Sequence, residues 1–177
     1  MPRVVLFVLS AMILFQTDVF AQARGIEVQA GAGYVFDAGE GPSVPAVNVG
    51  VVAWITRGWG MGVRLTEGVG HEYLDAPIEA FLGQGDLRMW TLTSEWRWFA
   101  RGTEVNVGLG VGGQGYRYHY DRAGQLIRRR SGSAIIPIDL LIGRRITGRL
   151  YVKGGFTYGL AGDAHPFQPV VVFAWKM

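Results

Sequence analysis

Apolar and polar residues alternate with a period of two along most of the chain after residue 25. The clearest stretch is 105–112, where Val or Leu at every odd position alternates with Asn or Gly at every even one. A period of two places alternate side chains on opposite faces of a β-strand, whereas an amphipathic helix repeats every 3.6 residues. The pattern therefore predicts β-strands with one apolar face and one polar or small face.

Eight stretches of this kind follow one another, at 26–36, 47–55, 59–66, 90–98, 105–112, 134–143, 150–158 and 170–177. A tilted strand of about 9 to 11 residues crosses a bilayer. The predicted connections alternate between short turns at 56–58, 100–104 and 144–149 and long loops at 37–46, 67–89, 116–133 and 159–168. This layout predicts an all-β protein, an eight-stranded antiparallel up-and-down transmembrane β-barrel with both ends on the short-turn side.

The polar face distinguishes a membrane barrel from a soluble one. Only 18% of the residues are charged and 49% are hydrophobic, and the polar face is rich in the chain's 27 glycines. The six charged residues on that face, which we predict to form an interior charge network, are Glu27, Arg64, Glu95, Arg97, Asp139 and Lys153. Aromatic residues gather near the strand ends on the other face, at Tyr34, Phe36, Trp59, Trp90, Trp98, Tyr158 and Trp175.

Few charges of mixed sign suit a narrow interior in which opposite charges pair, and aromatic girdles suit the two membrane interfaces. Neighbouring strands can bring Arg64 to Glu95 and Asp139 toward Lys153, but which acid pairs with which base depends on the strand register, which the sequence leaves open. A soluble lipocalin-like barrel or a β-sandwich is the alternative fold.

Residues 1–23 have the pattern of a cleaved signal peptide. Arg3 precedes an apolar run at 4–15, and small residues precede candidate cleavage sites after Ala21 or Ala23. The run is shorter than the roughly 20 residues of a membrane-spanning helix. We therefore predict export and a mature barrel of residues 24–177. The sequence has no cysteine, which excludes disulfides, thiolate catalysis and Cys-based zinc sites.

With these features the chain resembles the OmpX/OmpA-type family of small outer-membrane barrels over about residues 25–177. The last strand, 171–177, keeps the alternating aromatic pattern of that family but ends in Met177 where the family typically ends in Phe. The resemblance implies a protein of the outer membrane of a Gram-negative-type bacterium, inserted by the outer-membrane assembly machinery. Its implied partners are outer-membrane lipids, including lipopolysaccharide. The resemblance implies the barrel alone, and we expect no peptidoglycan-binding domain.

Motifs that could carry chemistry have structural interpretations. Residues 108–113 fit G-x-G-x-x-G, but no helix pattern follows, so we interpret the glycines as inward positions and 112–113 as a candidate β-bulge. The three histidines fall in predicted loops without metal-ligand spacing. Ser94 is the single serine in the middle of the apolar face, and no strand histidine accompanies it. The sequence predicts no catalytic residue, no metal site, no cofactor and no nucleic-acid partner.

A basic run, Arg128, Arg129 and Arg130, falls in the third long loop of a chain with a pI of about 9.4. It is either a solvated loop tip or a contact for anionic lipid head groups. The predicted function is a non-enzymatic outer-membrane barrel with a packed charged interior, serving envelope structure or surface interaction through its long loops. The alternatives are a membrane-embedded lipid-modifying hydrolase or acyltransferase, and a soluble periplasmic ligand carrier.

Overall fold

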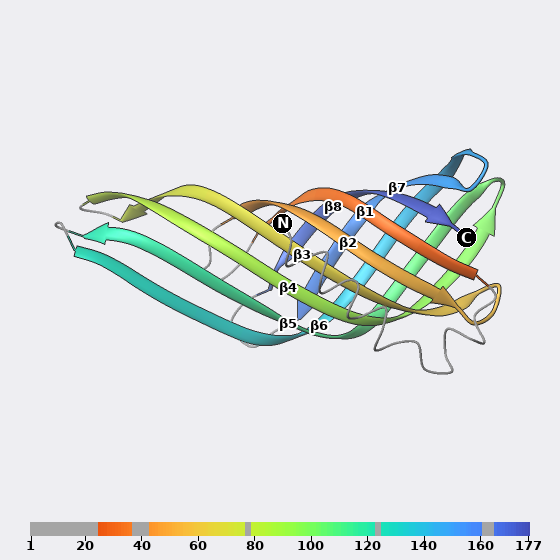
Figure 1. Cartoon of the computed structure of the whole chain (residues 1–177), viewed down its shortest axis with the longest axis horizontal. Coiled ribbons are helices and arrows are strands. Elements are labelled where there is room, and N and C mark those ends of the chain that lie inside the picture. Colours follow the sequence, from red (N-terminus) through yellow and green to blue (C-terminus); the bar gives the residue numbers. More distant parts are fainter. Residues whose placement is uncertain (1–24, 37–42, 77–78, 123–124, 161–164) are drawn as a thin grey trace.

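The computed structural model describes residues 25–36, 43–76, 79–122, 125–160 and 165–177 (Figure 1). The predicted signal peptide, 1–23, lies outside the described residues. No helix long and apolar enough to span a bilayer occurs in the described ranges. The chain forms eight strands: β1 (Gly25–Val35), β2 (Val44–Trp54), β3 (Trp59–Ala76), β4 (Glu79–Ala100), β5 (Thr103–Arg122), β6 (Gln125–Thr147), β7 (Leu150–Leu160) and β8 (Phe167–Lys176).

The strands close into a barrel in chain order, and every neighbouring pair is antiparallel. β1 and β8 complete the barrel over a register that runs from Glu27 opposite Lys176 to Gly33 opposite Val170. Closure leaves no free edge along the wall, which is the condition that a lipid environment imposes on a sheet. The predicted eight-stranded antiparallel barrel is confirmed.

Four strands are much longer than the sequence pattern indicated. β3, β4, β5 and β6 contain 18 to 23 residues, whereas the other four contain 10 or 11. In the regions 67–89 and 116–133, predicted as loops, the described residues 67–76, 79–89, 116–122 and 125–133 are instead strand extensions of the β3–β4 and β5–β6 hairpins, so that prediction is wrong for both. Figure 1 shows these hairpins reaching well beyond the remaining strands. Strands outside a membrane need no continuous apolar face, and the alternation used to find strands fades there.

The three predicted short turns lie together at the opposite end of the barrel. Residues 55–58 join β2 to β3, while Arg101 with Gly102 and Gly148 with Arg149 make two-residue connections. Arg101 and Gly102 have φ angles of 50° and 79°. Positive φ at both central residues is the type I′ geometry whose twist matches that of the flanking strands. The turn fixes the β4–β5 register at Ala100 opposite Thr103.

The glycine pair 112–113 is part of a continuous ladder. β5 keeps one register with β4 from Thr103 to Tyr120, and the buried Gln114 lies on the same inner face as Gly112. The predicted bulge is therefore wrong. Pairing of β5 with β6 is interrupted at Gly110 and Val111, which lie across from Pro137 and Ile136, and resumes in the same register. Proline has no N–H to donate to a ladder, which explains the gap.

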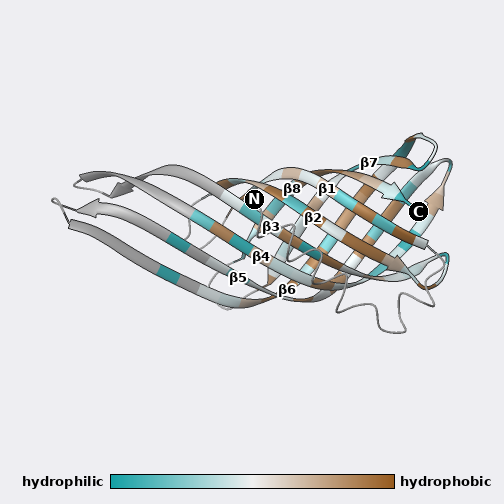
Figure 2. Cartoon of the chain, in the orientation of Figure 1, coloured by the Kyte–Doolittle hydropathy of each residue, from teal (hydrophilic) through white to brown (hydrophobic). Residues whose placement is uncertain are grey.

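The alternation divides the wall into an inner and an outer face, visible as bands of opposite hydropathy in Figure 2. On β8, Val171, Phe173 and Trp175 are each at least 50% exposed, whereas Val172 and Ala174 between them are fully buried. Large hydrophobic side chains thus cover the outside of the barrel along this strand. The interior contains the polar residues, and its chemistry is described next.

Candidate functional site

Lys153 of β7 is the centre of an ion-pair cluster inside the barrel, near the end that bears the short turns. Its ammonium donates hydrogen bonds to Glu27 Oε1 at 2.5 Å, Glu104 Oε1 at 2.8 Å and Asn106 Oδ1 at 3.3 Å. Lys153 and Glu27 are fully buried, and Glu104 is 1% exposed. Strands β1, β5 and β7 are therefore connected across the interior by one cation.

Lys176 of β8 completes this cluster. Its ammonium donates to Glu104 Oε2, lies 3.7 Å from Glu27 Oε2 and stacks 3.8 Å above the Tyr151 ring. Two lysines and two glutamates thus share one site, which we call the mouth quartet: Glu27, Glu104, Lys153 and Lys176. Because its formal charges sum to zero, each buried charge is compensated by neighbours of opposite sign.

A second cluster lies around Arg64 of β3. Its Nη1 donates to Asp139 Oδ1 at 2.8 Å and to Thr157 Oγ1 at 3.1 Å, and Nη2 lies 3.5 Å from Gln29 Oε1. The Thr157 hydroxyl donates to the same Asp139 oxygen at 2.5 Å. Arg64 therefore spans the interior from β3 to β6 and β7, which are not adjacent to it in the barrel wall.

The two clusters are connected through Gln29, whose Nε2 donates to Glu27 Oε1 at 2.8 Å. Arg64 pairs with Asp139, and Lys153 pairs with Glu27 and Glu104. The candidate pairs Arg64 with Glu95 and Asp139 with Lys153 are not the ones formed. The register is one reason, because Arg64 lies opposite Thr91 and Lys153 lies opposite Gly143. Side-chain length is the other, because long side chains in a narrow barrel can cross the lumen.

The other two residues of the predicted network, Glu95 and Arg97, have different environments. Glu95 is buried and accepts a hydrogen bond from Thr93 Oγ1 at 2.8 Å, with no ion pair within 4 Å among the described side chains. Arg97 lies at the mouth of the barrel, where its guanidinium stacks 3.8 Å above the Trp54 ring and donates to the Arg57 carbonyl. The structure thus brings four of the six residues into ion pairs and leaves these two outside them.

Glu104 and Lys176 were missed from the sequence. Glu104 was assigned to a turn, whereas β5 begins at Thr103. Lys176 lies in the last strand, where both faces are largely apolar and contrast is weak. The alternation of faces along each strand was the available signal. Glu104 falls in the same set of inward-facing alternate positions as Asn106, and Lys176 falls in the same set as Val172 and Ala174.

Glycine makes room for these side chains at Gly108. A Cβ there would lie 3.1 Å from both Glu95 Oε1 and Asp139 Oδ2. At Gly110 the constraint comes from the wall itself, since a Cβ would overlap the Leu92 carbonyl oxygen. The G-x-G-x-x-G pattern therefore reflects close packing on one strand, in agreement with the structural interpretation of its glycines.

The interior of the barrel becomes apolar toward the protruding hairpins. Val35, Val44, Ala46 and Leu87 form a buried apolar cluster at that end, and Met89 and Ile135 are also buried. The polar interior is therefore bounded by aliphatic side chains on one side and by the mouth quartet on the other. Such a filled interior is typical of eight strands, whose lumen is just wide enough for side chains.

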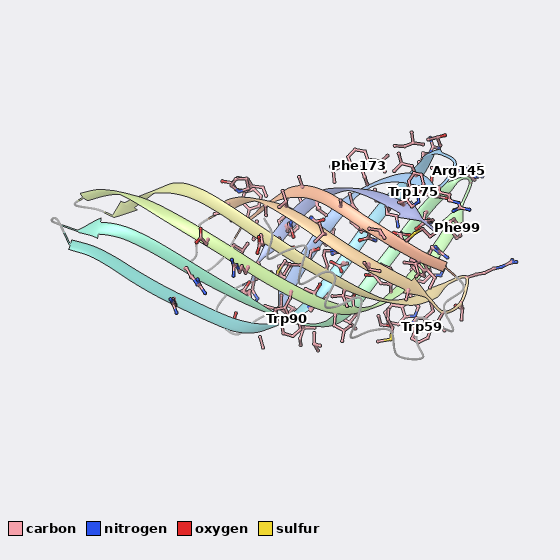
Figure 3. All side chains as sticks on the ribbon, viewed as in Figure 1. Trp59, Trp90, Phe99, Arg145, Phe173 and Trp175 are labelled. Atoms are coloured by element: carbon pink, nitrogen blue, oxygen red, sulfur yellow. The ribbon has the colours of Figure 1, made fainter. Side chains whose placement is uncertain are left out.

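The outer surface has aromatic residues near both ends of the apolar band. Figure 3 shows Trp59, Trp175 and Phe99 near the end with the short turns, and Trp90 farther toward the hairpins. Trp59 Nε1 donates to Ser94 Oγ at 2.7 Å across the β3–β4 pair. The hydroxyl of Ser94 is thus the hydrogen-bond acceptor for an interfacial tryptophan. Among the residues that the structure describes, no group of acidic or histidine side chains could hold a metal ion.

The basic run lies on strand β6 and not in a loop, which corrects its predicted location. Arg130 is exposed and lies opposite the exposed Arg117 of β5. The side chains of Arg128 and Arg129 lie outside the described part of the structure. Arg88 of β4 is exposed at the base of the same sheet, 3.4 Å from Glu67.

Solved structures with the same fold are outer-membrane proteins. The barrel superposes on a major outer membrane protein from Thermus thermophilus with a TM-score of 0.65 and 15% identity, covering 86% of this chain and 99% of that one. OprG from Pseudomonas aeruginosa gives 0.64 at 10% identity over 88% and 97%. Ail, the attachment invasion locus protein of Yersinia pestis, gives 0.63 at 11% identity over 86% and 98%.

No protein-family model and no curated protein sequence matched the chain. At these identities the likeness to solved structures concerns the fold, which is that of the small eight-stranded outer-membrane β-barrels.

Proposed function

We propose that this protein is a non-enzymatic integral outer-membrane β-barrel with a packed, charged interior, serving envelope structure or surface interaction through its protruding hairpins. The observation that carries the proposal is the inverted polarity of the wall. Large apolar side chains such as Phe173 and Trp175 are half exposed outside, while Lys153, Glu27 and Asp139 are buried inside. In water this arrangement is unfavourable, because it exposes a continuous apolar surface to solvent and also buries charged groups. In a bilayer the same arrangement is stable.

Export and orientation follow from the same proposal. The signal peptide, 1–23, is cleaved after Ala21 or Ala23, and the assembly machinery inserts the barrel of residues 24–177. The short turns then face the periplasm of a Gram-negative-type bacterium, and the β3–β4 and β5–β6 hairpins face the exterior, since this is the usual layout of bacterial barrels.

The interior acts as a structural core and not as an open channel. The mouth quartet and the Arg64 cluster cross the lumen, and aliphatic side chains close its other end. Apart from Lys176 with Glu27 on the adjacent β8 and β1, each of these ion pairs connects strands that do not neighbour one another, so it resists deformation of the barrel cross-section. We expect purified protein in planar bilayers to conduct ions poorly.

We propose that the outer surface between the apolar band and the hairpin tips contacts anionic lipids. Arg88, Arg117 and Arg130 are exposed there on three successive strands, and Trp90 follows two residues after Arg88 on β4. Arginine binds phosphate groups through paired hydrogen bonds, so lipopolysaccharide phosphates are suitable ligands. Ail, which has the same fold, has been crystallised with the heparin analogue sucrose octasulfate. Its sulfated ligand supports an anion-binding surface on this kind of barrel.

The alternative functions receive less support. A hydrolase would need an activated nucleophile, but the Ser94 hydroxyl accepts a hydrogen bond from Trp59, and its register partners on β3 and β5 are Met61 and Leu109. A soluble carrier would need a polar exterior, whereas large apolar side chains are exposed on the outside of this barrel and several charged ones are buried inside it.

Membrane fractionation with heat-modifiable gel mobility tests the proposal. Wild-type protein should fractionate with the outer membrane, and unheated samples should migrate faster than heated ones because the barrel stays folded in detergent. A matched variant, Val171→Asp on the outer face, should reduce the folded fraction, whereas Arg145→Asp near a periplasmic turn should not. Recovery in the soluble periplasmic fraction would favour the carrier. Altered lipid products in membranes containing wild-type protein but not Ser94→Ala would favour the enzyme.

A further inference from the structure

The two long hairpins form a four-stranded sheet above the barrel with two outer edges. β2 pairs with β3 only as far as Gly68, and β7 pairs with β6 only from Ile136 onward. Beyond these points, within the described residues, 69–76 of β3 and 125–135 of β6 have no strand on their outer side. Backbone N–H and C=O groups at such edges are available for pairing with another strand.

The two hairpins carry opposite charge. Residues 69–86 of the β3–β4 hairpin contain four acidic residues and no Lys or Arg: Glu72, Asp75, Glu79 and Asp86. Residues 116–133 of the β5–β6 hairpin contain five arginines and one acidic residue: Arg117, Arg122, Arg128, Arg129, Arg130 and Asp121. On the edge strands themselves, the acidic residues are Glu72 and Asp75 of β3, and the basic ones are Arg128, Arg129 and Arg130 of β6.

Strand direction allows these edges to pair between copies in one membrane. β3 runs from a short turn toward its hairpin tip, and β6 runs from its tip back toward a short turn, so the two strands are antiparallel. Two copies with the same orientation in a membrane can thus place β6 of one beside β3 of the other as an antiparallel pair. Two β6 edges would instead be parallel and would bring arginines together, which is unfavourable.

We infer that copies of this protein associate side by side in the membrane through this sheet, with the β6 edge of each copy pairing with the β3 edge of the next. The inference rests on the proposed membrane insertion, which gives all copies one orientation. The arginines on β6 disfavour pairing between the β6 edges of two copies, because like charges would face each other. The acidic residues of the β3–β4 hairpin of another copy have the complementary charge. Since each copy has one edge of each kind, the contact is head-to-tail and allows assemblies larger than dimers.

Disulfide crosslinking in native outer membranes tests this pairing, because the chain has no cysteine of its own. One tagged copy carries Ser131→Cys on β6, and a co-expressed copy with a second tag carries a single cysteine scanned along 69–76 of β3. We expect mixed disulfide dimers for at least one position in that scan. Cells with two Ser131→Cys copies should give far fewer dimers. Equal or greater crosslinking between the two β6 edges would overturn the proposed geometry.

Charge reversal makes the test specific. Replacing Arg128, Arg129 and Arg130 by Glu in the β6 copy should lower the mixed dimer about tenfold or more, because like charges then face each other. Glu72→Lys with Asp75→Lys in the other copy should restore it. Arg145→Glu, near the periplasmic end of β6, is the matched control and should change nothing. A yield of mixed disulfide dimer that does not change with these charge reversals would overturn the inference.

Heat-modifiable gel mobility, measured on the same samples, distinguishes a failure of membrane insertion from a failure of edge pairing. If wild-type protein lacks the mobility shift and leaves the membrane fraction, the proposed membrane insertion fails. If every copy is folded in the outer membrane and no mixed disulfide forms, insertion stands and the edge pairing is wrong.

Discussion

Removing the central cation of the mouth quartet should destabilise the barrel strongly. Lys153→Met keeps the aliphatic length of the side chain but deletes the ammonium that contacts Glu27 Oε1 at 2.5 Å and Glu104 Oε1 at 2.8 Å. Both carboxylates are buried, and Lys176 is then the remaining cation for the two of them. Breaking a buried ion pair by removing one partner costs about 3 to 5 kcal/mol. We expect a loss in that range in the free energy of unfolding.

Urea unfolding in lipid vesicles, followed by tryptophan fluorescence and gel mobility, measures this loss. Arg57→Met, an exposed turn position, is the control and should change stability by no more than about 0.5 kcal/mol. Lys153→Met combined with Glu27→Gln restores neutrality, so the double variant should be less destabilised than the sum of the singles by about 1 kcal/mol or more. A Lys153→Met loss below about 1 kcal/mol, or simple additivity in the double variant, would refute the reasoning.

Three further predictions concern the wall. Leu109→Arg, in the middle of a strand on the outer face, should lower the free energy of unfolding in vesicles by about 2 to 4 kcal/mol. Trp98→Arg, near a short turn, should lower it by about 1 kcal/mol or less. Equal losses would contradict a lipid environment that differs between the two positions. Gly110→Val should abolish the folded gel band, because its Cβ would overlap the Leu92 carbonyl, and normal folding would show that β4 and β5 are less closely packed. Ser94→Ala should leave membrane lipid composition unchanged in mass spectrometry.

The wall of the barrel was predictable from sequence because a physical constraint repeats along it. Every strand that faces lipid on one side and a narrow lumen on the other must alternate, so the inner positions of Glu27, Arg64 and Asp139 could be assigned from parity. The protruding hairpins were not predictable in this way. Beyond Gly68 of β3 and before Ile136 of β6 the hairpins extend past the neighbouring strands, and the contrast between apolar and polar faces that identifies a strand is lost there.

Ion-pair partners were harder to predict than inner positions. The sequence identified β3 and β4 as neighbours, which made Arg64 and Glu95 candidate partners, but it did not fix their register. In the structure Arg64 lies opposite Thr91, and Glu95 lies opposite Gly60. The guanidinium instead crosses the lumen to Asp139, because the side chain is long and Thr157 holds the same carboxylate. Lumen-spanning contacts depend on the barrel's closure and on side-chain length together, and neither is contained in the pattern of any one strand.

Spin labels along the outer face of β5 test the central claim most directly, namely that the apolar face meets lipid. Single cysteines at Val105, Val107, Leu109 and Val111 can be labelled in the otherwise cysteine-free protein after reconstitution in vesicles. We predict that collision with oxygen, which concentrates in the bilayer, exceeds collision with a water-soluble nickel reagent most strongly in the middle of this series. Access of the nickel reagent to all four labels, with no dependence on position, would contradict a transmembrane barrel.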